Sequence, residues 1–120
     1  MTTSSRAAPV VLAALLAFTA NPSAMAGTSV RDAEIDGLLD AVEHSDCSFE
    51  RNGRQYDGPR ARKHLQRKRD YLGDRLTSAE DFIRYAATES SRSGKPYLII
   101  CAGETTPSAA TMCRERRCDE

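Results

Sequence analysis

The sequence predicts a small α+β fold, in which an antiparallel sheet packs against three to four helices and disulfides staple the chain. Two observations predict the sheet. Asn52-Gly53 lies between short alternating segments, which predicts a hairpin over residues 47–56. Residues 97–101 form a short apolar, β-branched run, which predicts a strand. The roughly 40 residues between them carry helical periodicity, and four cysteines follow an export signal.

The first 26 residues have the three parts of a secretory signal peptide. Arg6 is the basic start, residues 10–20 are apolar, and Ala24-Met25-Ala26 is a cleavage site before Gly27. The apolar part is too short for a permanent span, which needs about 20 residues. We therefore expect residues 1–26 to be removed. Residues 27–120 would remain as one small domain, in the periplasm or secreted, without a stable membrane anchor.

The overall charge is balanced. The chain has 17 basic and 17 acidic residues, and loss of Arg6 would leave a net charge of about −1. Such a balance gives no global attraction to nucleic acid or to an anionic membrane. We therefore expect no nucleic-acid partner.

The cysteines are Cys47, Cys101, Cys113 and Cys118. An even number in a small exported domain favours disulfides. Of three possible connectivities, we favour Cys47–Cys101 with Cys113–Cys118; a free or intermolecular pair is the alternative. The spacing lacks a Cys-x-x-Cys, so no metal site is expected. Cysteines five apart on an intact helix are too far apart to bond, so a helix there must end between them.

Apolar periodicity predicts one helix before the hairpin and one helix after it. The first is capped by Ser29 and ends near His44, and its apolar stripe is Ile35, Leu38, Leu39 and Val42. The second follows the cap Asp57 with Pro59 in its first turn, covers residues 60–72 and stops at Gly73.

The C-terminal third is predicted to contain two further helices around the strand. Residues 77–80 form a capping box for a third helix, which Gly94 terminates. Pro96 then leads into strand 97–101, which we expect to be central and buried on both faces. Thr106-Pro107 would start a last helix of about ten residues, and the tail 114–120 is charge-rich.

Residues 47–103 resemble the YfeK-like family of small exported bacterial proteins. The resemblance rests on four blocks in order, at residues 49–56, 64–68, 78–83 and 90–97. It implies a periplasmic protein with a small α+β domain, and it implies no activity, because this is a domain of unknown function. The short C-terminus with two cysteines departs from the family pattern.

Ser93-Gly94-Lys95-Pro96-Tyr97 is the most conspicuous motif for chemistry. A phosphate-binding loop would continue from Gly-Lys into a helix, whereas Pro96 and a strand follow here. We therefore interpret the motif as structural. The alternative is a small polar or anionic ligand site that Ser90, Ser91, Ser93 and Lys95 line.

Helix 60–72 carries His64 and a basic run over residues 60–69. His64 is expected to be a boundary residue with one bonded nitrogen, and as a general base it would need a partner nucleophile. The run is expected to be a solvated face. Asp70, Asp74, Glu80 and Asp81 would neutralise much of it, or it would contact an anionic envelope surface or an acidic protein.

No assembled catalytic set and no cofactor motif is evident, so the sequence favours a non-enzymatic exported module that binds an unknown protein or envelope partner. Its speculative contacts are Ser91, Ser93, Lys95 and His64. The alternative is a small envelope enzyme, possibly hydrolytic, that uses residues near Ser90–Lys95. A weaker alternative is an inhibitor that inserts the hairpin into another envelope protein.

Overall fold

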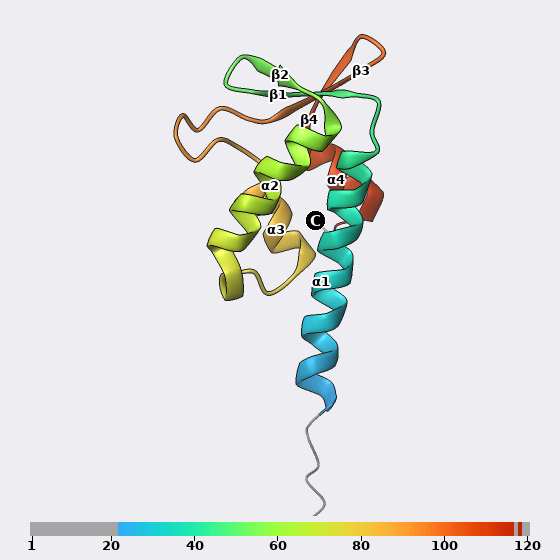
Figure 1. The fold of residues 1–120 in the computed structure, drawn as a ribbon, viewed down its shortest axis with the longest axis vertical. Coiled ribbons are helices and arrows are strands. Elements are labelled where there is room, and N and C mark those ends of the chain that lie inside the picture. The colour runs from blue at the N-terminus through green and yellow to red at the C-terminus, as the bar shows by residue number, and fades with distance from the viewer. Residues whose placement is uncertain (1–21, 117, 119–120) are drawn as a thin grey trace, which may run out of the picture.

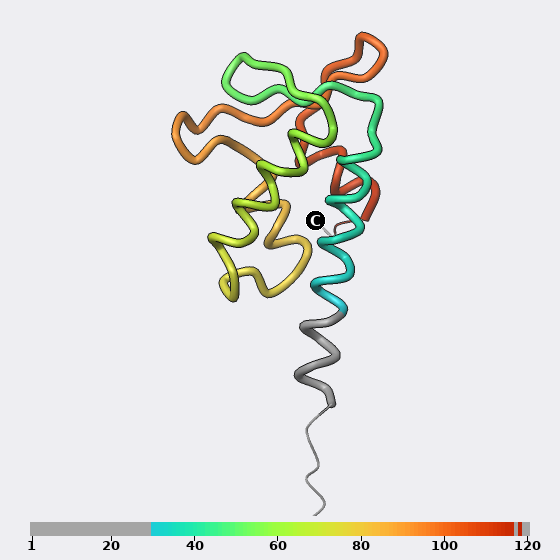
Figure 2. Tube along the Cα trace, in the orientation of Figure 1, coloured from blue at the N-terminus to red at the C-terminus, as the bar shows by residue number. Residues whose placement is uncertain are grey.

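The computed structural model describes residues 22–116 and 118, with side chains from Val30 onward (Figure 2). Four helices and a four-stranded antiparallel sheet confirm the predicted fold class (Figure 1). In chain order the elements are α1 (Pro22–Glu43), β1 (Ser48–Arg51), β2 (Arg54–Tyr56), α2 (Gly58–Leu72), the 3-10 turn η1 (Gly73–Arg75), α3 (Ala79–Ala86), β3 (Leu98–Cys101), β4 (Glu104–Pro107) and α4 (Ser108–Arg116).

The sheet has the order β2-β1-β3-β4, with every neighbouring pair antiparallel. Asn52 and Gly53 have φ of 52° and 79°, as the predicted hairpin turn requires. The helices lie on one side of the sheet (Figure 1). Of β3 only Ile99 is buried, so the expectation that this strand is buried on both faces is wrong, although it is an inner strand.

Strand β4 was not predicted. Ala102 and Gly103 have φ of 48° and 81° and turn the chain back on itself. Glu104–Pro107 then pairs with β3, so the last helix begins at Ser108 rather than at Thr106. Pro107 has no amide hydrogen to donate, which suits the last residue of an edge strand.

Helix α1 begins earlier than predicted. It extends from Pro22 to Glu43, so Ser29 lies inside it and is not its cap. Alanine and methionine at residues 24–26 are strong helix formers, and they carry the helix toward its N-terminus. Residues 1–21 of the predicted signal peptide lie outside the described residues. No helix among the described residues is long and apolar enough to cross a bilayer.

Helix α2 confirms its predicted cap and its predicted end, and it begins at Gly58, two residues before the predicted span. The Asp57 side chain accepts a hydrogen bond from the Arg60 amide at 3.0 Å, and Gly73 with φ of 51° ends the helix. Gly58 lies against the end of α1: a Cβ on it would be 2.4 Å from the Val42 carbonyl oxygen. Only glycine allows this approach of two helices.

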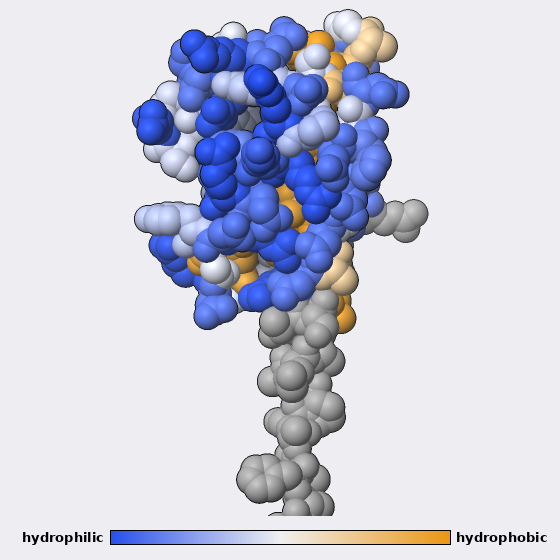
Figure 3. Space-filling model, in the orientation of Figure 1, coloured by the Kyte–Doolittle hydropathy of each residue, from blue (hydrophilic) through white to orange (hydrophobic). Residues whose placement is uncertain are grey.

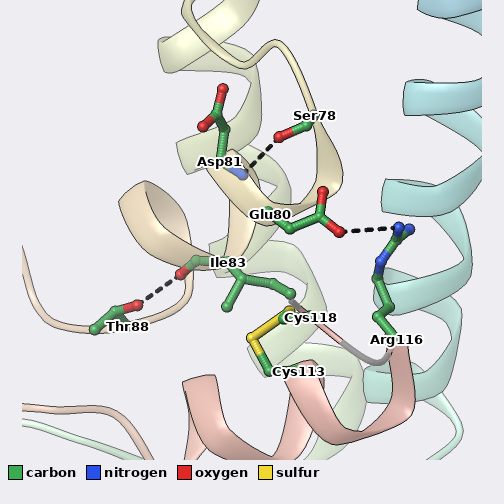
Figure 4. Close-up of a disulfide and its surroundings, with 8 residues drawn as sticks. All are labelled: Ser78, Glu80, Asp81, Ile83, Thr88, Cys113, Arg116 and Cys118. Atoms are coloured by element: carbon green, nitrogen blue, oxygen red, sulfur yellow. Dashed lines mark hydrogen bonds and ion pairs between the residues drawn. A yellow bond between two sulfur atoms is a disulfide. The ribbon is translucent and has the colours of Figure 1, made fainter. Parts of the chain in front are cut away.

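Helix α3 is shorter than predicted. Its cap is Ser78, which accepts from the Asp81 amide at 3.1 Å (Figure 4). The Asp81 carboxylate in turn accepts from the Thr77 amide at 2.9 Å. The capping box is therefore one residue later than predicted. The helix ends at Ala86, and Gly94, with φ of 69°, shapes the following loop rather than terminating the helix.

The core lies between the helices and the covered face of the sheet. The predicted stripe of α1 is buried throughout, with exposures of 0–4%. The fully buried large side chains are Phe82, Ile35, Leu39 and Leu76. Leu65 of α2 and Ile99 of β3 are also buried in this core.

Two disulfides staple the fold with the favoured connectivity. Cys47–Cys101 ties the approach to β1 to the end of β3. Cys113–Cys118 closes the C-terminus, and α4 ends at Arg116, between the two cysteines, as its geometry required (Figure 4). Arg116 anchors this end through Glu80, at 3.2 Å, and Glu34, at 2.6 Å.

Candidate functional site: a cationic cleft between helix α2 and the hairpin

The basic helix α2 has two differently used faces. On one face, Arg62 pairs with Asp40 and Glu43, and Arg69 pairs with Asp36 and Asp32. All four acids belong to α1, which corrects the expectation that residues 70–81 would neutralise the run. α1 and α2 pack closely, and these pairs lie along their contact.

The other face of α2 borders two adjoining hollows. The inner hollow has a volume of about 310 Å³ and lies between α2 and β1. The outer cleft has a volume of about 850 Å³ and lies between α2, the hairpin tip and the loop after α3. Their common lining residues are Arg51, Tyr56, His64, Arg67 and Tyr97.

At this shared wall four side chains form a cluster, which we call the cationic cluster: Arg51, His64, Lys68 and Tyr97. The Arg51 guanidinium is 3.0 Å from His64 Nδ1, and His64 Nε2 is 2.9 Å from Tyr97 Oη. Lys68 Nζ donates to Tyr97 Oη at 3.1 Å and to the Glu89 carbonyl oxygen at 3.0 Å. Three elements, β1, α2 and the approach to β3, therefore converge on one point.

The hydrogen-bond distances indicate which groups of the cluster donate and which accept. A guanidinium can only donate, and Arg51 Nη1 is 3.0 Å from His64 Nδ1 and 3.4 Å from Nε2. With the closer Nδ1 as the acceptor, the neutral imidazole carries its proton on Nε2. Tyr97 Oη then accepts from both His64 and Lys68. Its own hydrogen has no acceptor among the hydrogen bonds of the described residues. The phenol is therefore a donor available to a ligand.

Burial and positive charge both act on the protonation of the cluster. Burial, then Arg51, Lys68 and Arg67, lower the pKa of His64 from 6.5 to about 4. Burial also lowers the pKa of Lys68 and raises that of Tyr97. At neutral pH the imidazole and the phenol are thus uncharged.

The charge of the outer cleft is one-sided. Its cationic lining residues are Arg51, Arg54, Arg67, Lys68 and Arg92, and no Asp or Glu is among the described residues that line it. The molecular face over α2 and the hairpin is almost entirely hydrophilic (Figure 3). An anion entering the cleft would therefore meet several cations, while the nearby Glu89 carboxylate, which raises the pKa of Lys68, does not line the cleft.

The loop after α3 forms the far wall of the cleft and is fastened to the hairpin tip. Asn52 Nδ2 donates to Ser90 Oγ at 3.1 Å, and Ser93 Oγ donates to Asn52 Oδ1. Ser90 is buried, with 5% exposure, and its Oγ also accepts from the Arg92 amide at 3.3 Å. These bonds hold the loop in place beside the cluster.

The structure brings together two of the four predicted contact residues. Ser91 and His64 both line the outer cleft. Ser93 is used in the hairpin contact and accepts from the Lys95 amide at 3.2 Å; neither Ser93 nor Lys95 lines the cleft. No hydrogen bond joins Ser91 to His64 among the described residues, and no carboxylate accompanies them.

Sequence reasoning did not identify Arg51, Lys68 and Tyr97 as site residues. A signal was present, because Arg51 alternates with Cys47 and Phe49 on the inward side of β1. Lys68 lies three residues after Leu65 on the buried side of α2. Cations at positions that the periodicity assigns to the core are the feature to look for.

The comparisons with known proteins identify a family. A family of unknown function, DUF5329, matches residues 29–117. The chain belongs to the DUF5329 family. This DUF5329 member is also 37% identical over 67 residues to the uncharacterized protein YfeK of Salmonella typhimurium, which confirms the resemblance drawn from the sequence. The match covers 55% of this chain, and the chain spans about half, 56%, of that relative's length. No solved structure matches.

Proposed function

We propose that this chain is an exported, non-enzymatic binding module whose outer cleft takes an anionic ligand. The observation that carries the proposal is the partly buried cationic cluster, which faces a cleft lined by cations and by no carboxylate among the described residues. Partly buried cations are costly unless counter-charges offset them, and the Glu89 carboxylate, which raises the pKa of Lys68, offsets only part of this positive charge. A bound anion would offset that cost and accept the hydrogen of Tyr97.

Export is supported by the signal-like N-terminus and by the two disulfides, which persist in oxidising compartments. Expression of the full sequence in a bacterial host tests it. We expect the protein in the periplasmic or secreted fraction. Its mass should be that of a chain that starts at Gly27, and thiol titration should find no free thiol. A full-length, reduced protein in the cytoplasm would contradict export.

Anion binding is tested by titrating the exported protein with inorganic phosphate, followed by calorimetry. Arg51→Gln should weaken binding about tenfold or more, because a charge-assisted hydrogen bond contributes about 1.5–3 kcal/mol. Arg114→Gln is the matched control, because this exposed arginine of α4 lies outside both hollows. If phosphate does not bind, or both variants lose it equally, the proposal is wrong.

A small hydrolytic envelope enzyme remains the second candidate, and the shared position of Ser91 and His64 favours it. Ser91→Ala should abolish hydrolysis of chromogenic ester or phosphate substrates if that serine is the nucleophile. Absence of turnover in the exported protein, or turnover that Ser91→Ala leaves unchanged, would reject this mechanism.

A further inference from the structure

The chain contains four tyrosines and no tryptophan, and all four tyrosines line the outer cleft. They come from β2, α2, α3 and the approach to β3, namely Tyr56, Tyr71, Tyr85 and Tyr97. No sequence periodicity groups them; the fold brings them together. The cleft therefore concentrates the aromatic hydroxyl side chains of the whole protein at the mouth of its cationic cluster.

Two of these rings are exposed. Tyr71 is 78% exposed and Tyr85 is 52% exposed. Among the described residues only one other large apolar side chain, Val30, is comparably exposed. Exposed aromatic rings that gather in one cleft are typical of a binding surface, whereas scattered ones need no explanation.

An arginine lies over each exposed ring. The Arg75 guanidinium lies 5.1 Å from the Tyr71 ring centre, and Arg84 lies 6.0 Å from that of Tyr85. Because both rings are largely exposed, each offers surface on which a flat ligand can stack in addition to its arginine. The buried Tyr97 differs, because Lys68 and His64 hold it within the cluster.

The size of the outer cleft also exceeds what a bare inorganic anion needs. Its volume of about 850 Å³ is in the range of small-molecule sites, which is about 300–1,000 Å³. The hydroxyls of Ser91, Tyr71 and Tyr85 make no hydrogen bond to any described residue. They could therefore bind a ligand that is rich in hydroxyls.

We infer that the ligand is an acidic sugar, a sugar ring that carries a phosphate or carboxylate group. This inference rests on the proposed anion-binding function and names the ligand class of the same cleft. The anionic group would lie at Arg51, Lys68 and the Tyr97 hydroxyl. The apolar face of the ring would stack on Tyr71 or Tyr85, and its hydroxyls would meet Ser91 and the phenols.

The experiment compares four probes on the exported protein by calorimetry: inorganic phosphate, glucose, glucose 6-phosphate and adenosine monophosphate. Glucose 6-phosphate should bind about tenfold tighter than inorganic phosphate, because ring stacking adds to the anion contact. Glucose alone should bind far more weakly. Adenosine monophosphate should bind no tighter than glucose 6-phosphate.

Variants separate the ring contact from the anion contact. Tyr71→Ala with Tyr85→Ala should remove the advantage of glucose 6-phosphate and leave phosphate affinity unchanged. The matched Phe variants should keep most of it, because they retain the rings and lose only the phenol hydroxyls. Both side chains are exposed, so the melting temperature should stay the same.

The outcomes distinguish the two proposals. Equal affinities for phosphate and glucose 6-phosphate would overturn the sugar inference and leave anion binding intact. Tighter binding of adenosine monophosphate would show that a nucleobase, rather than a sugar, occupies the rings. Failure of every anion to bind would reject the proposed function itself.

Discussion

The protonation of His64 offers the sharpest quantitative test of the cationic cluster. Burial and three neighbouring cations, Arg51, Lys68 and Arg67, lower its pKa from 6.5 to about 4. The imidazole should therefore stay neutral through the range in which an ordinary histidine becomes charged. The perturbation is a titration from pH 8 to about pH 3.5, a range that brackets both values.

The same shift predicts how stability depends on pH. Between pH 6.5 and about 4, the unfolded chain binds a proton at His64 that the native chain does not. The free energy of unfolding should therefore fall as the pH falls through this window. Above pH 6.5 the titration of His64 should not reduce the free energy of unfolding. Without solvent screening, the pKa shift of His64 would correspond to a loss of about 3 kcal/mol in the free energy of unfolding. Because His64 is partly exposed, we expect a loss of about 1–2 kcal/mol.

Proton NMR measures the pKa directly, because the chain has only two histidines. His44→Gln assigns the two imidazole signals. Arg51→Gln should raise the pKa of His64 only part of the way to 6.5, because burial is its largest cause. Urea denaturation at pH 7 and pH 4.5 measures how the free energy of unfolding depends on pH. His64→Gln is the control, because it lacks the titrating group.

Three results would refute this reasoning. A His64 pKa at or above 6.5 would show that the imidazole is solvated or paired with an acid. Full recovery to 6.5 in Arg51→Gln would show that charge, rather than burial, dominates. An unchanged pH dependence of unfolding in His64→Gln would show that other groups cause the destabilisation.

Changes at a disulfide, at a glycine and at a helix cap test the framework around the site. Cys113→Ser with Cys118→Ser should lower the free energy of unfolding by roughly 2 kcal/mol, since the bond closes a short loop; an unchanged urea midpoint would contradict this. Gly58→Ala should cost about 1–3 kcal/mol, because its Cβ would meet the Val42 carbonyl oxygen at 2.4 Å; tolerance in thermal melts would refute that contact. Ser78→Ala should cost about 1 kcal/mol by loss of the α3 cap, and Ser78→Asp should restore most of it.

Local signals predicted much of the fold because they depend on neighbouring residues. Asn52-Gly53 determined the hairpin turn, and Asp57 and Gly73 marked the limits of α2. Of the three possible disulfide connectivities, the favoured one is present. The end of α3 was misplaced because Gly94 is a turn residue in either context. Only tertiary contacts show that it turns a loop and does not end a helix.

The two further errors have the same physical origin. Strand β4 is polar and lies at the sheet edge, so pairing with β3, rather than propensity, makes it a strand. The cationic cluster was missed because its members are far apart in the sequence, with Arg51 on β1, Lys68 on α2 and Tyr97 before β3. Each residue could be recognised in the sequence as a polar side chain at an unusual position. Only the folded structure shows that the three side chains meet.

The sorting of arginines along α2 gives the protein an electric dipole that its composition conceals. Arg62 and Arg69 are neutralised by α1, while Arg67 and Lys68 on the other side face the outer cleft. A chain whose 17 basic and 17 acidic residues balance would thus still present one cationic pole. It would adsorb to a cation exchanger in one orientation near its isoelectric point, and a charged ligand would approach it from one side.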